Sequence, residues 1–396
     1  MPTVDFARTL SNIEGEVEEG IFTRGAQVSV RVGGEELFSS ALGEAGNGTP
    51  MTAGSVLRVY CAIKPVTALA VARQVDAGTL DLDEPLHERL PDVRALADGA
   101  VTLRHVLNHT AGIHVPGALE VEMVAPAKRP AYLDAAPREP GWHVGIDAGY
   151  SEIFGWDVLG RLLEQVTGEP LGQHLRSAVL EPLGLTSTWI GMTPDEYRAL
   201  LPRIGVSYDM RTDRAYPLLL ERGERMCTEV NPAHGGYSTA SDMSRLYARV
   251  LDGLAAEDAP PGLPSPDTLA TFTTAARPVT YDVVLDRPCE HGLGFMTALK
   301  GHAFGAACSP RSFGHSGNVG ATFAFADPDY DLAVGVVFNG VVDHESAVLR
   351  RPALVRAIYL DLDDAGLGPA QTDATEADAD APEPRRRRWF GRHREP

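Results

Sequence analysis

The chain has 396 residues, of which 44% are hydrophobic and 22% are charged, values that are ordinary for a soluble globular protein. Its net charge of -19 argues against nucleic acids and anionic membrane surfaces as partners. The four cysteines are scattered and form no C-x-x-C pair, so a zinc ribbon is excluded and a disulfide scaffold is disfavoured.

The N-terminal segment, residues 1–20, is acidic and lacks the apolar core of a secretory signal. No stretch of the sequence is long and apolar enough to predict a membrane span. We therefore expect a cytoplasmic protein whose thiols stay reduced.

Two elements are predicted in the first part of the chain. Residues Ala26–Leu42 show the pattern of a β-hairpin, because apolar and polar residues alternate on either side of a Gly33-Gly34 turn. From about Cys61 to Val75 the chain is almost continuously apolar and then reaches Gly78. An all-round apolar pattern of this kind predicts a buried, central helix.

The middle of the chain is predicted to be mostly helical between Val101 and Gly191. Apolar residues at helical spacing indicate helices over Ile153–Val166 and Leu171–Leu180. A further helix is expected over Ser241–Leu251, with Ser241 as its N-cap.

Strand patterns return from about Gly294 onward. The segments Thr322–Phe325 and Leu332–Val337 flank Asp327–Asp329, which is typical hairpin chemistry. A helix over Ser346–Leu360 closes the pattern. Strands at both ends and helices between them predict a discontinuous α/β domain that holds a helical insertion.

This organisation predicts one domain over residues 1–365, with its α/β part at about 1–80 and 260–365 and its helical part at about 81–259. Residues 366–396 have no core-forming pattern, and we expect this acidic, arginine-rich tail to be disordered. Its run Arg385–Arg388 could contact an acidic partner or a membrane surface, and a solvated tail is the alternative.

Lysine is rare in this chain. Among 35 basic residues, only Lys64, Lys128 and Lys300 are lysines. Arginine keeps its proton near neutral pH, whereas a desolvated lysine can lose it. Each lysine is therefore a candidate for a titratable amine, although an ordinary surface lysine is the alternative.

The segment around Cys61 predicts a reactive thiol. Proline is tolerated in the first turn of a helix, so Pro65 places the helix start at about Cys61. The thiol would then lie at the positive end of the helix dipole, one turn from Lys64. Both features favour the thiolate. A buried structural cysteine is the alternative interpretation.

The chain resembles serine β-lactamases of the AmpC type, D-alanyl-D-alanine peptidases and related esterases and transacylases. These proteins carry S-x-x-K, Y-x-N and then K-T-G or H-x-G, in that order. The three motifs have counterparts here in Cys61–Lys64, Tyr150–Glu152 and His315–Gly317. Further similar blocks are Asp81–Leu86, Val101–Gly112, Pro182–Gly184 and Gly235–Asp242. Two positions depart from the pattern, with cysteine in place of serine and Glu152 in place of asparagine.

The resemblance implies an α/β (α+β) fold of the β-lactamase/transpeptidase type, in which helices flank an antiparallel sheet and an all-helical insertion is added. It also implies roles for three residues. Cys61 would attack a substrate carbonyl, Lys64 would tune the protonation of Cys61, and Tyr150 would carry a proton between the nucleophile and the leaving group.

The remaining site residues follow from the same resemblance. The backbone N–H groups of Cys61 and Asn318 would form an oxyanion hole. His315, Ser316 and Gly317 would line the strand edge where substrate lies. Glu152 would pair either with a cationic substrate or with Lys64, and in the second case it would keep Lys64 protonated beside a thiolate.

No metal or other cofactor is expected at this site. The run of His105, His109 and His114 lacks the glutamate of an H-E-x-x-H motif, so we do not predict a zinc site from it.

A cysteine nucleophile shifts the expected function from hydrolysis towards transfer, because amines attack thioesters more readily, relative to water, than they attack esters. We therefore predict an ATP-independent acyltransferase of specialised metabolism that uses a small-molecule acyl donor and an amine or alcohol acceptor. The alternatives are a Cys61-dependent esterase or amidase, and an inactive binding protein that has kept the pocket.

Overall fold

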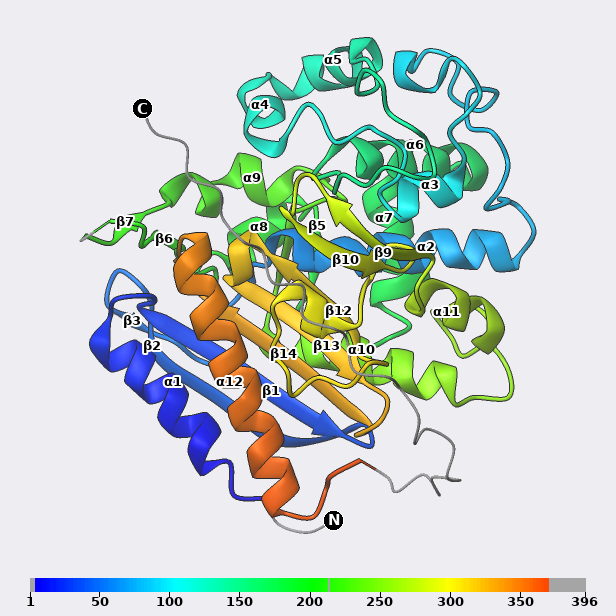
Figure 1. The fold of residues 1–396 in the computed structure, drawn as a ribbon. Coiled ribbons are helices and arrows are strands. Elements are labelled where there is room, and N and C mark those ends of the chain that lie inside the picture. The colour runs from blue at the N-terminus through cyan, green and yellow to red at the C-terminus, as the bar shows by residue number, and fades with distance from the viewer. Residues whose placement is uncertain (1–3, 213, 370–396) are drawn as a thin grey trace, which may run out of the picture.

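The computed structural model describes residues 4–212 and 214–369. Most of the predicted disordered tail lies outside these residues. The architecture is a nine-stranded sheet with helices on both faces (Figure 1). In spatial order its strands are β3 (Thr49–Pro50), β2 (Glu35–Gly46), β1 (Gly25–Val32), β14 (Leu332–Phe338), β13 (Thr322–Asp327), β12 (Phe313–Gly317), β11 (Met296–Thr297), β10 (Arg287–His291) and β9 (Arg277–Asp282).

The two ends of the chain meet in the centre of this sheet. β1 pairs antiparallel with β14, in a register that sets Val28 opposite Val336, and the strands that follow in the sheet are also antiparallel. β1 and β2 form the hairpin predicted over Ala26–Leu42, and β13 and β14 form the one predicted around Asp327–Asp329. The antiparallel sheet flanked by helices is therefore confirmed.

Two long helices cover one face of the sheet. α1 (Ala7–Glu19) and α12 (His344–Asp364) lie side by side across it (Figure 1). They bury a core that includes Ile13, Val334 and Leu354. The predicted closing helix over Ser346–Leu360 is thus confirmed, with a few more residues at each end.

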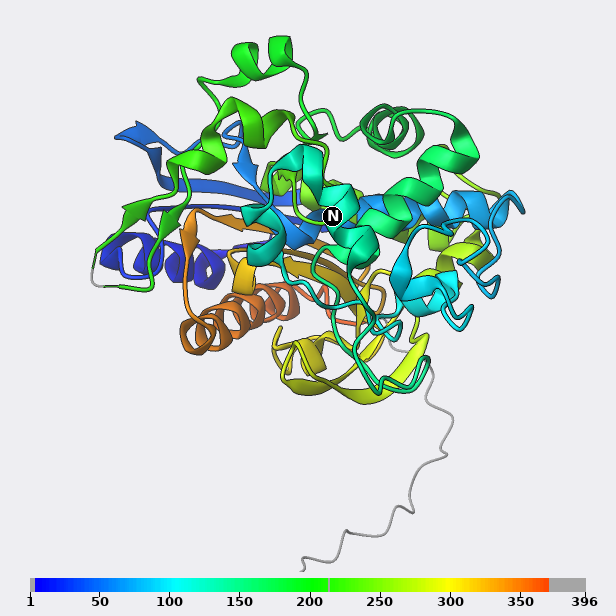
Figure 2. The ribbon, with the colours of Figure 1, turned by 90° about the horizontal axis from the view of Figure 1, so that it is seen from above.

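The other face carries the larger core and the remaining helices (Figure 2). These are α2 (Lys64–Asp76), α3 (Leu103–Leu107), α4 (Ala118–Met123), α5 (Arg129–Ala135), α6 (Phe154–Thr167), α7 (Leu171–Leu175), α8 (Pro194–Leu200), α9 (Glu224–Thr228), α10 (Ala240–Leu254) and α11 (Pro266–Thr273).

α2 is the central helix of the molecule. All its residues from Lys64 to Ala72 are buried, and it contacts α6, α11 and β12. Small side chains such as Ala68 and Ala70 let these neighbours approach from every side. The prediction of a buried central helix is confirmed.

Three details differ from the sequence predictions. The α-helix begins at Lys64, and Cys61 lies in a preceding 3-10 turn, η1 (Tyr60–Ile63), because Pro65 occupies the first turn of the α-helix itself. The N-cap of α10 is Thr239, whose side chain accepts a bond from the Asp242 N–H, and not Ser241.

The third difference is that the insertion is not all-helical. Two small sheets lie within and beside it. One has the strand order β4 (Leu57–Arg58), β8 (Gly236–Ser238) and β5 (Trp189–Ile190), and the other has the order β15 (Gly340–Val341), β6 (Tyr208–Asp209) and β7 (Tyr216–Pro217). These strands are two or three residues long, too short for a readable alternation. No helix within residues 4–212 and 214–369 has the length and apolarity to cross a membrane.

Candidate active site

Cys61 is the one partly exposed thiol of the four cysteines. It lies in η1 directly before α2, and the Lys64 N–H donates to its carbonyl oxygen. Cys227, Cys289 and Cys308 are buried, and burial raises the thiol pKa of each, to about 11 for Cys289 and about 12 for Cys308. Cys61 is therefore the thiol best placed to meet a substrate.

Lys64 is fully buried beside Cys61. Its Nζ donates to two backbone carbonyl oxygens, that of Glu152 at 2.8 Å and that of Ala233 at 2.9 Å. The Nζ also lies 5.1 Å from the ring centre of Tyr150 and 5.3 Å from that of Trp156. Burial lowers the pKa of Lys64, and the nearby Cys61 and Glu152 raise it only in part. These surroundings make the ammonium form of Lys64 less favourable than it is in water.

Glu152 does not hold Lys64 through its carboxylate. Its Oε2 accepts a hydrogen bond of 2.8 Å from the N–H of Ala118, at the start of α4, and only its backbone carbonyl contacts Lys64. Of the two predicted pairings of the Glu152 carboxylate, the one with a cationic substrate stays a prediction, and the one with Lys64 is therefore not formed. The reason is that the side chain turns towards the unpaired N–H groups of α4, which a carboxylate stabilises.

Tyr150 and His315 face each other next to Lys64. The Tyr150 hydroxyl lies 3.5 Å from His315 Nε2, and both residues are buried. His315 Nδ1 lies 2.8 Å from the carbonyl oxygen of Ser316, which can only accept, so Nδ1 carries the proton. Nε2 is then free to accept from the Tyr150 hydroxyl.

Both groups stay uncharged in this environment. Burial raises the pKa of Tyr150 well above its usual value, and Cys61 raises it further. Burial also lowers the pKa of His315 well below its usual value, with Lys64 adding to the effect. The site thus holds a neutral phenol, a neutral imidazole and a lysine whose proton is weakened.

Within β12, successive side chains point to opposite faces. His315 points towards Tyr150, whereas the Ser316 hydroxyl lies 3.9 Å from the sulfur of Met296, which packs in the core under α12. The side chains of His315 and Ser316 therefore point to opposite faces of β12, and their role along a strand edge where substrate lies stays a prediction. The backbone of Ser316 remains beside the site.

Gly317 brings the end of β12 against the turn that carries Cys61. A Cβ atom at this position would lie 2.4 Å from the carbonyl oxygen of Val59 and 3.1 Å from the N–H nitrogen of Ala62. Only glycine permits this approach. Asn318, whose N–H is predicted to form an oxyanion hole with that of Cys61, is the next residue in the chain.

Backbone strain is concentrated around these residues. Tyr60, His109, Asn318 and Val319 have positive φ angles of 48°, 62°, 41° and 54°. Such angles are unfavourable for non-glycine residues, above all for the β-branched Val319, and they are typical of functional sites.

A buried charge cluster under η1 was not found from the sequence. Arg58 donates to Glu221 Oε1 at 3.1 Å and to Glu122 Oε1 at 3.1 Å, and its guanidinium contacts His234 Nδ1 at 2.6 Å. Tyr60, directly before Cys61, donates its hydroxyl to Glu221 Oε2 at 2.7 Å. This cluster holds Tyr60 in its strained conformation.

His109 is a second residue that sequence reasoning left without a role. Its ring lies 4.6 Å from the Tyr150 ring, and its Nδ1 accepts from the N–H of Ser151 at 3.0 Å. It therefore fixes the motif that carries Tyr150. His109 lies in the block Val101–Gly112, and the similarity of this block to the family was the sequence signal that pointed to it.

Comparison with known proteins gives a consistent result. The profile of the Beta-lactamase family matches residues 13–358. Esterase EstB of Burkholderia gladioli is 28% identical over 391 residues, which cover 90% of this chain and 97% of that protein.

Solved structures agree with this match. A penicillin-binding protein homologue from Caulobacter crescentus is 25% identical with a TM-score of 0.73, over 90% of this chain and 97% of that one. EstCE1, described as a hydrolase with promiscuous acyltransferase activity, is 22% identical with a TM-score of 0.73, over 89% of this chain and 98% of that one. The fold of the chain is thus that of enzymes of acyl transfer and hydrolysis.

Proposed function

Since the chain belongs to the beta-lactamase family, we propose that it transfers an acyl group from a small-molecule donor to an amine or alcohol through a thioester on Cys61. Catalytic roles are assigned here to Cys61, Lys64 and Tyr150, and oxyanion stabilisation to the N–H groups of Cys61 and Asn318. We further propose a reducing, cytoplasmic location, which keeps the Cys61 thiol free.

The environment of Lys64 is the observation that carries this proposal. A neutral amine has two N–H bonds and one lone pair. The carbonyl oxygens of Glu152 and Ala233 take both N–H bonds, so the lone pair is left for a third partner. The neighbouring group of matching chemistry is the Cys61 thiol, which interacts with Lys64. Lys64 is therefore suited to accept the thiol proton.

Acylation then proceeds in one balanced exchange. The Cys61 sulfur attacks the donor carbonyl as its proton moves to Lys64, and the carbonyl oxygen becomes an oxyanion held by two backbone N–H groups. The bond between the carbonyl carbon and the leaving group breaks. The leaving group takes a proton from the Tyr150 hydroxyl, and Lys64 restores that proton.

Transfer reverses these steps with a new nucleophile. The acceptor amine or alcohol attacks the thioester carbonyl, and its proton passes to Lys64 through the Tyr150 hydroxyl. The carbon–sulfur bond breaks, and the departing sulfur takes the proton back. His315 Nε2 accepts from the Tyr150 hydroxyl while Tyr150 is protonated, and it thereby orients that hydroxyl before the proton is transferred.

Preference for transfer over hydrolysis rests on the sulfur. A thioester reacts with amines more readily, relative to water, than an oxygen ester does, so cysteine in this position favours transfer. EstCE1, a structural relative of similar fold, is itself described as a hydrolase with promiscuous acyltransferase activity. A Cys61-dependent hydrolase is the second candidate, and EstB, an esterase, supports it.

The test is a partition experiment. The protein is given butanoyl-N-acetylcysteamine, a small thioester, with increasing concentrations of benzylamine, and both N-benzylbutanamide and butanoic acid are measured. We expect the amide-to-acid ratio to rise in proportion to the amine, and Cys61→Ser to shift products towards the acid. Acid alone at every amine concentration would establish the hydrolase instead. Turnover in Cys61→Ala equal to wild type would reject both.

A further inference from the structure

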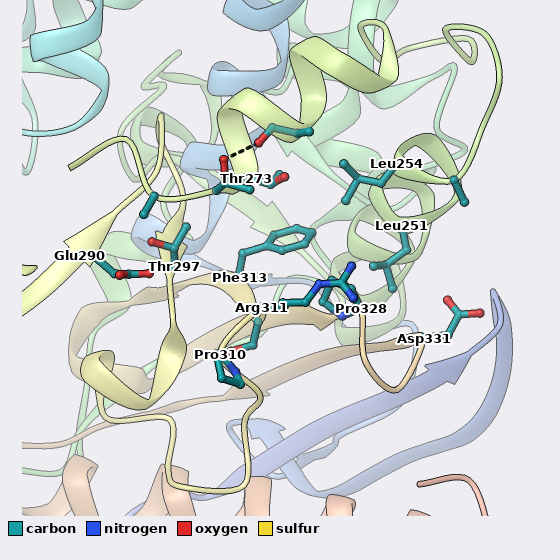
Figure 3. A pocket seen from close by; sticks show the side chains of 15 residues that line it. Leu251, Leu254, Thr273, Glu290, Thr297, Pro310, Arg311, Phe313, Pro328 and Asp331 are labelled. Atoms are coloured by element: carbon teal, nitrogen blue, oxygen red, sulfur yellow. Dashed lines mark hydrogen bonds between the residues drawn. The ribbon is translucent and has the colours of Figure 1, made fainter. Parts of the chain in front are cut away.

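A cavity of about 680 Å³ lies away from Cys61, between α10, α11 and strands β10 to β12 (Figure 3). This volume is within the range of sites for drug-sized ligands. Its apolar walls are formed by side chains from α10, α11 and β12, chiefly Leu251, Leu254, Ala270 and Phe313.

The cavity is separate from the candidate active site. Phe313, the first residue of β12, lines the cavity, and Gly317, the last, packs against the backbone around Cys61. At about 3.3 Å per residue along a strand, the two ends of β12 are about 13 Å apart. A small molecule in the cavity would therefore not reach the Cys61 sulfur.

One end of the cavity carries a buried hydroxyl that has no hydrogen-bond partner in the described part of the chain. Thr297 is only 3% exposed, and its hydroxyl has no hydrogen-bond partner in the described part of the chain. β10 and β11 pair with His291 opposite Met296, a register that places Glu290 opposite Thr297. Figure 3 shows both side chains on the same side of the cavity. A buried hydroxyl without a partner is unfavourable, so this end is suited to a polar group of a ligand.

The charge of the lining favours a cation. Within residues 4–212 and 214–369, neither Glu290 nor Asp331 forms an ion pair. Arg311, the one basic residue of the lining, donates to Asp329 at 2.9 Å.

We propose that this cavity binds an apolar organic amine in its ammonium form. The ammonium group lies between the Glu290 carboxylate and the Thr297 hydroxyl, and the apolar body packs on Phe313, Leu251 and Leu254. An ammonium group gives the Thr297 hydroxyl a donor and the Glu290 carboxylate a counter-charge together, whereas a carboxylate ligand would face like charge and an alcohol would supply no charge.

The experiment measures binding of 4-phenylbutylamine to the full-length Cys61→Ala variant by calorimetry, so that no turnover interferes. We expect saturable binding at one site, roughly tenfold weaker binding of 4-phenylbutan-1-ol, and a roughly tenfold loss for the amine in Glu290→Gln. Ala270→Phe fills the cavity and should abolish binding. Glu257→Gln, an exposed charge change outside the lining, should leave it unchanged.

Thermal unfolding of each variant shows that the folded protein was tested. The proposal fails if the Cys61→Ala protein, whose cavity lining is unchanged, shows no saturable binding of the amine. It also fails if binding survives both Glu290→Gln and Ala270→Phe. It also fails if the alcohol or 4-phenylbutanoate binds as tightly as the amine, since the site would then not select a cation. None of these outcomes depends on the acyl-transfer activity of Cys61.

Discussion

At the scale of single residues, the proposed chemistry depends on the proton of Lys64. Its amine is buried, and its two carbonyl partners, Glu152 and Ala233, accept hydrogen bonds but supply no counter-charge. The Glu152 carboxylate accepts a hydrogen bond from the Ala118 N–H and does not contact Nζ. This is important for the proposed role of Lys64, because a carboxylate at Nζ would stabilise the charged form of the amine.

Replacing Lys64 by methionine, which has a similar length, should lower the acylation rate by about 10²–10⁴-fold, since the thiol loses its proton acceptor. Lys64→Arg should behave alike, because arginine cannot accept a proton. Cys61→Ala gives the background rate. The rate of leaving-group release from a thioester donor measures the effect, and wild-type rates in both Lys64 variants would contradict the assignment.

The same residue predicts a pH dependence. The pKa of Lys64 in the folded protein lies below its usual value, and only the deprotonated amine accepts a proton. The acylation rate should therefore fall as the pH drops through this lowered pKa and level off above it. A pH–rate profile of acylation checks this, and a rate that rises towards acid pH would show that protonated Lys64 is the active form.

His315 predicts a smaller effect through Tyr150. His315→Phe keeps a ring but removes the Nε2 acceptor, so the Tyr150 hydroxyl loses its orientation. We expect the acylation rate to fall roughly tenfold, the size of one hydrogen bond, with little change in KM. Burst kinetics separates these two parameters. An equal change in KM and rate would indicate instead that His315 contacts the substrate.

At the scale of elements, the site depends on the contact between β12 and the turn η1. Gly317→Ala would bring a Cβ atom within 2.4 Å of the Val59 carbonyl oxygen. We expect this change to lower the free energy of unfolding by about 1–3 kcal/mol and to slow acylation, because Asn318 moves away from Cys61.

Gly15→Ala is the matched control for this substitution. Gly15 lies in α1, and a Cβ atom there would have no neighbour within 4 Å. Alanine should therefore leave acylation unchanged and stabilise the helix by about 0.5–1 kcal/mol. Chemical denaturation and the acylation rate measure both variants. If both variants had the same stability and acylation rate, the close contact between β12 and η1 would not be needed for folding or for acylation.

At the scale of the whole molecule, the sheet joins both ends of the chain through β1 and β14. A change under α12 should therefore weaken the entire fold. Leu354→Ala removes a fully buried side chain of the core under α12 and should lower the free energy of unfolding by about 2–5 kcal/mol. Leu349→Ala, on the same helix but 71% exposed, should change it by less than about 0.5 kcal/mol.

Tryptophan fluorescence is a suitable probe for this pair, since Trp156 is buried beside Lys64, on the other face of the sheet from α12. A fluorescence unfolding midpoint that Leu354→Ala does not move would contradict a single cooperative sheet.

Much of this architecture is readable from the sequence. Apolar–polar alternation marks β1, two apolar runs on either side of Asp327–Asp329 mark β13 and β14, and the apolar run after Cys61 marks α2. The order of the three motifs also anticipates that Cys61, Lys64 and Tyr150 meet. The periodic patterns are local, and the order of the motifs matches a known family, so both can be recognised in a single sequence.

Other features could not be read in this way. Arg58 and Glu221 are 163 positions apart and follow no pattern, so their pairing under η1 appears only in the fold. The direction of Glu152 depends on α4, which begins at Ala118 in a segment without a clear period. The opposite orientation of His315 and Ser316 was available in principle, because neighbouring residues of a strand face opposite sides.

The central claim is that Cys61 carries the acyl group. Mass spectrometry of the intact protein and of its peptides, after brief exposure to butanoyl-N-acetylcysteamine, tests this claim directly. The account predicts one butanoyl group on the Cys61 peptide of the wild type, no adduct in Cys61→Ala, and discharge by benzylamine. An adduct of equal yield in Cys61→Ala, or one located on another residue, would contradict it.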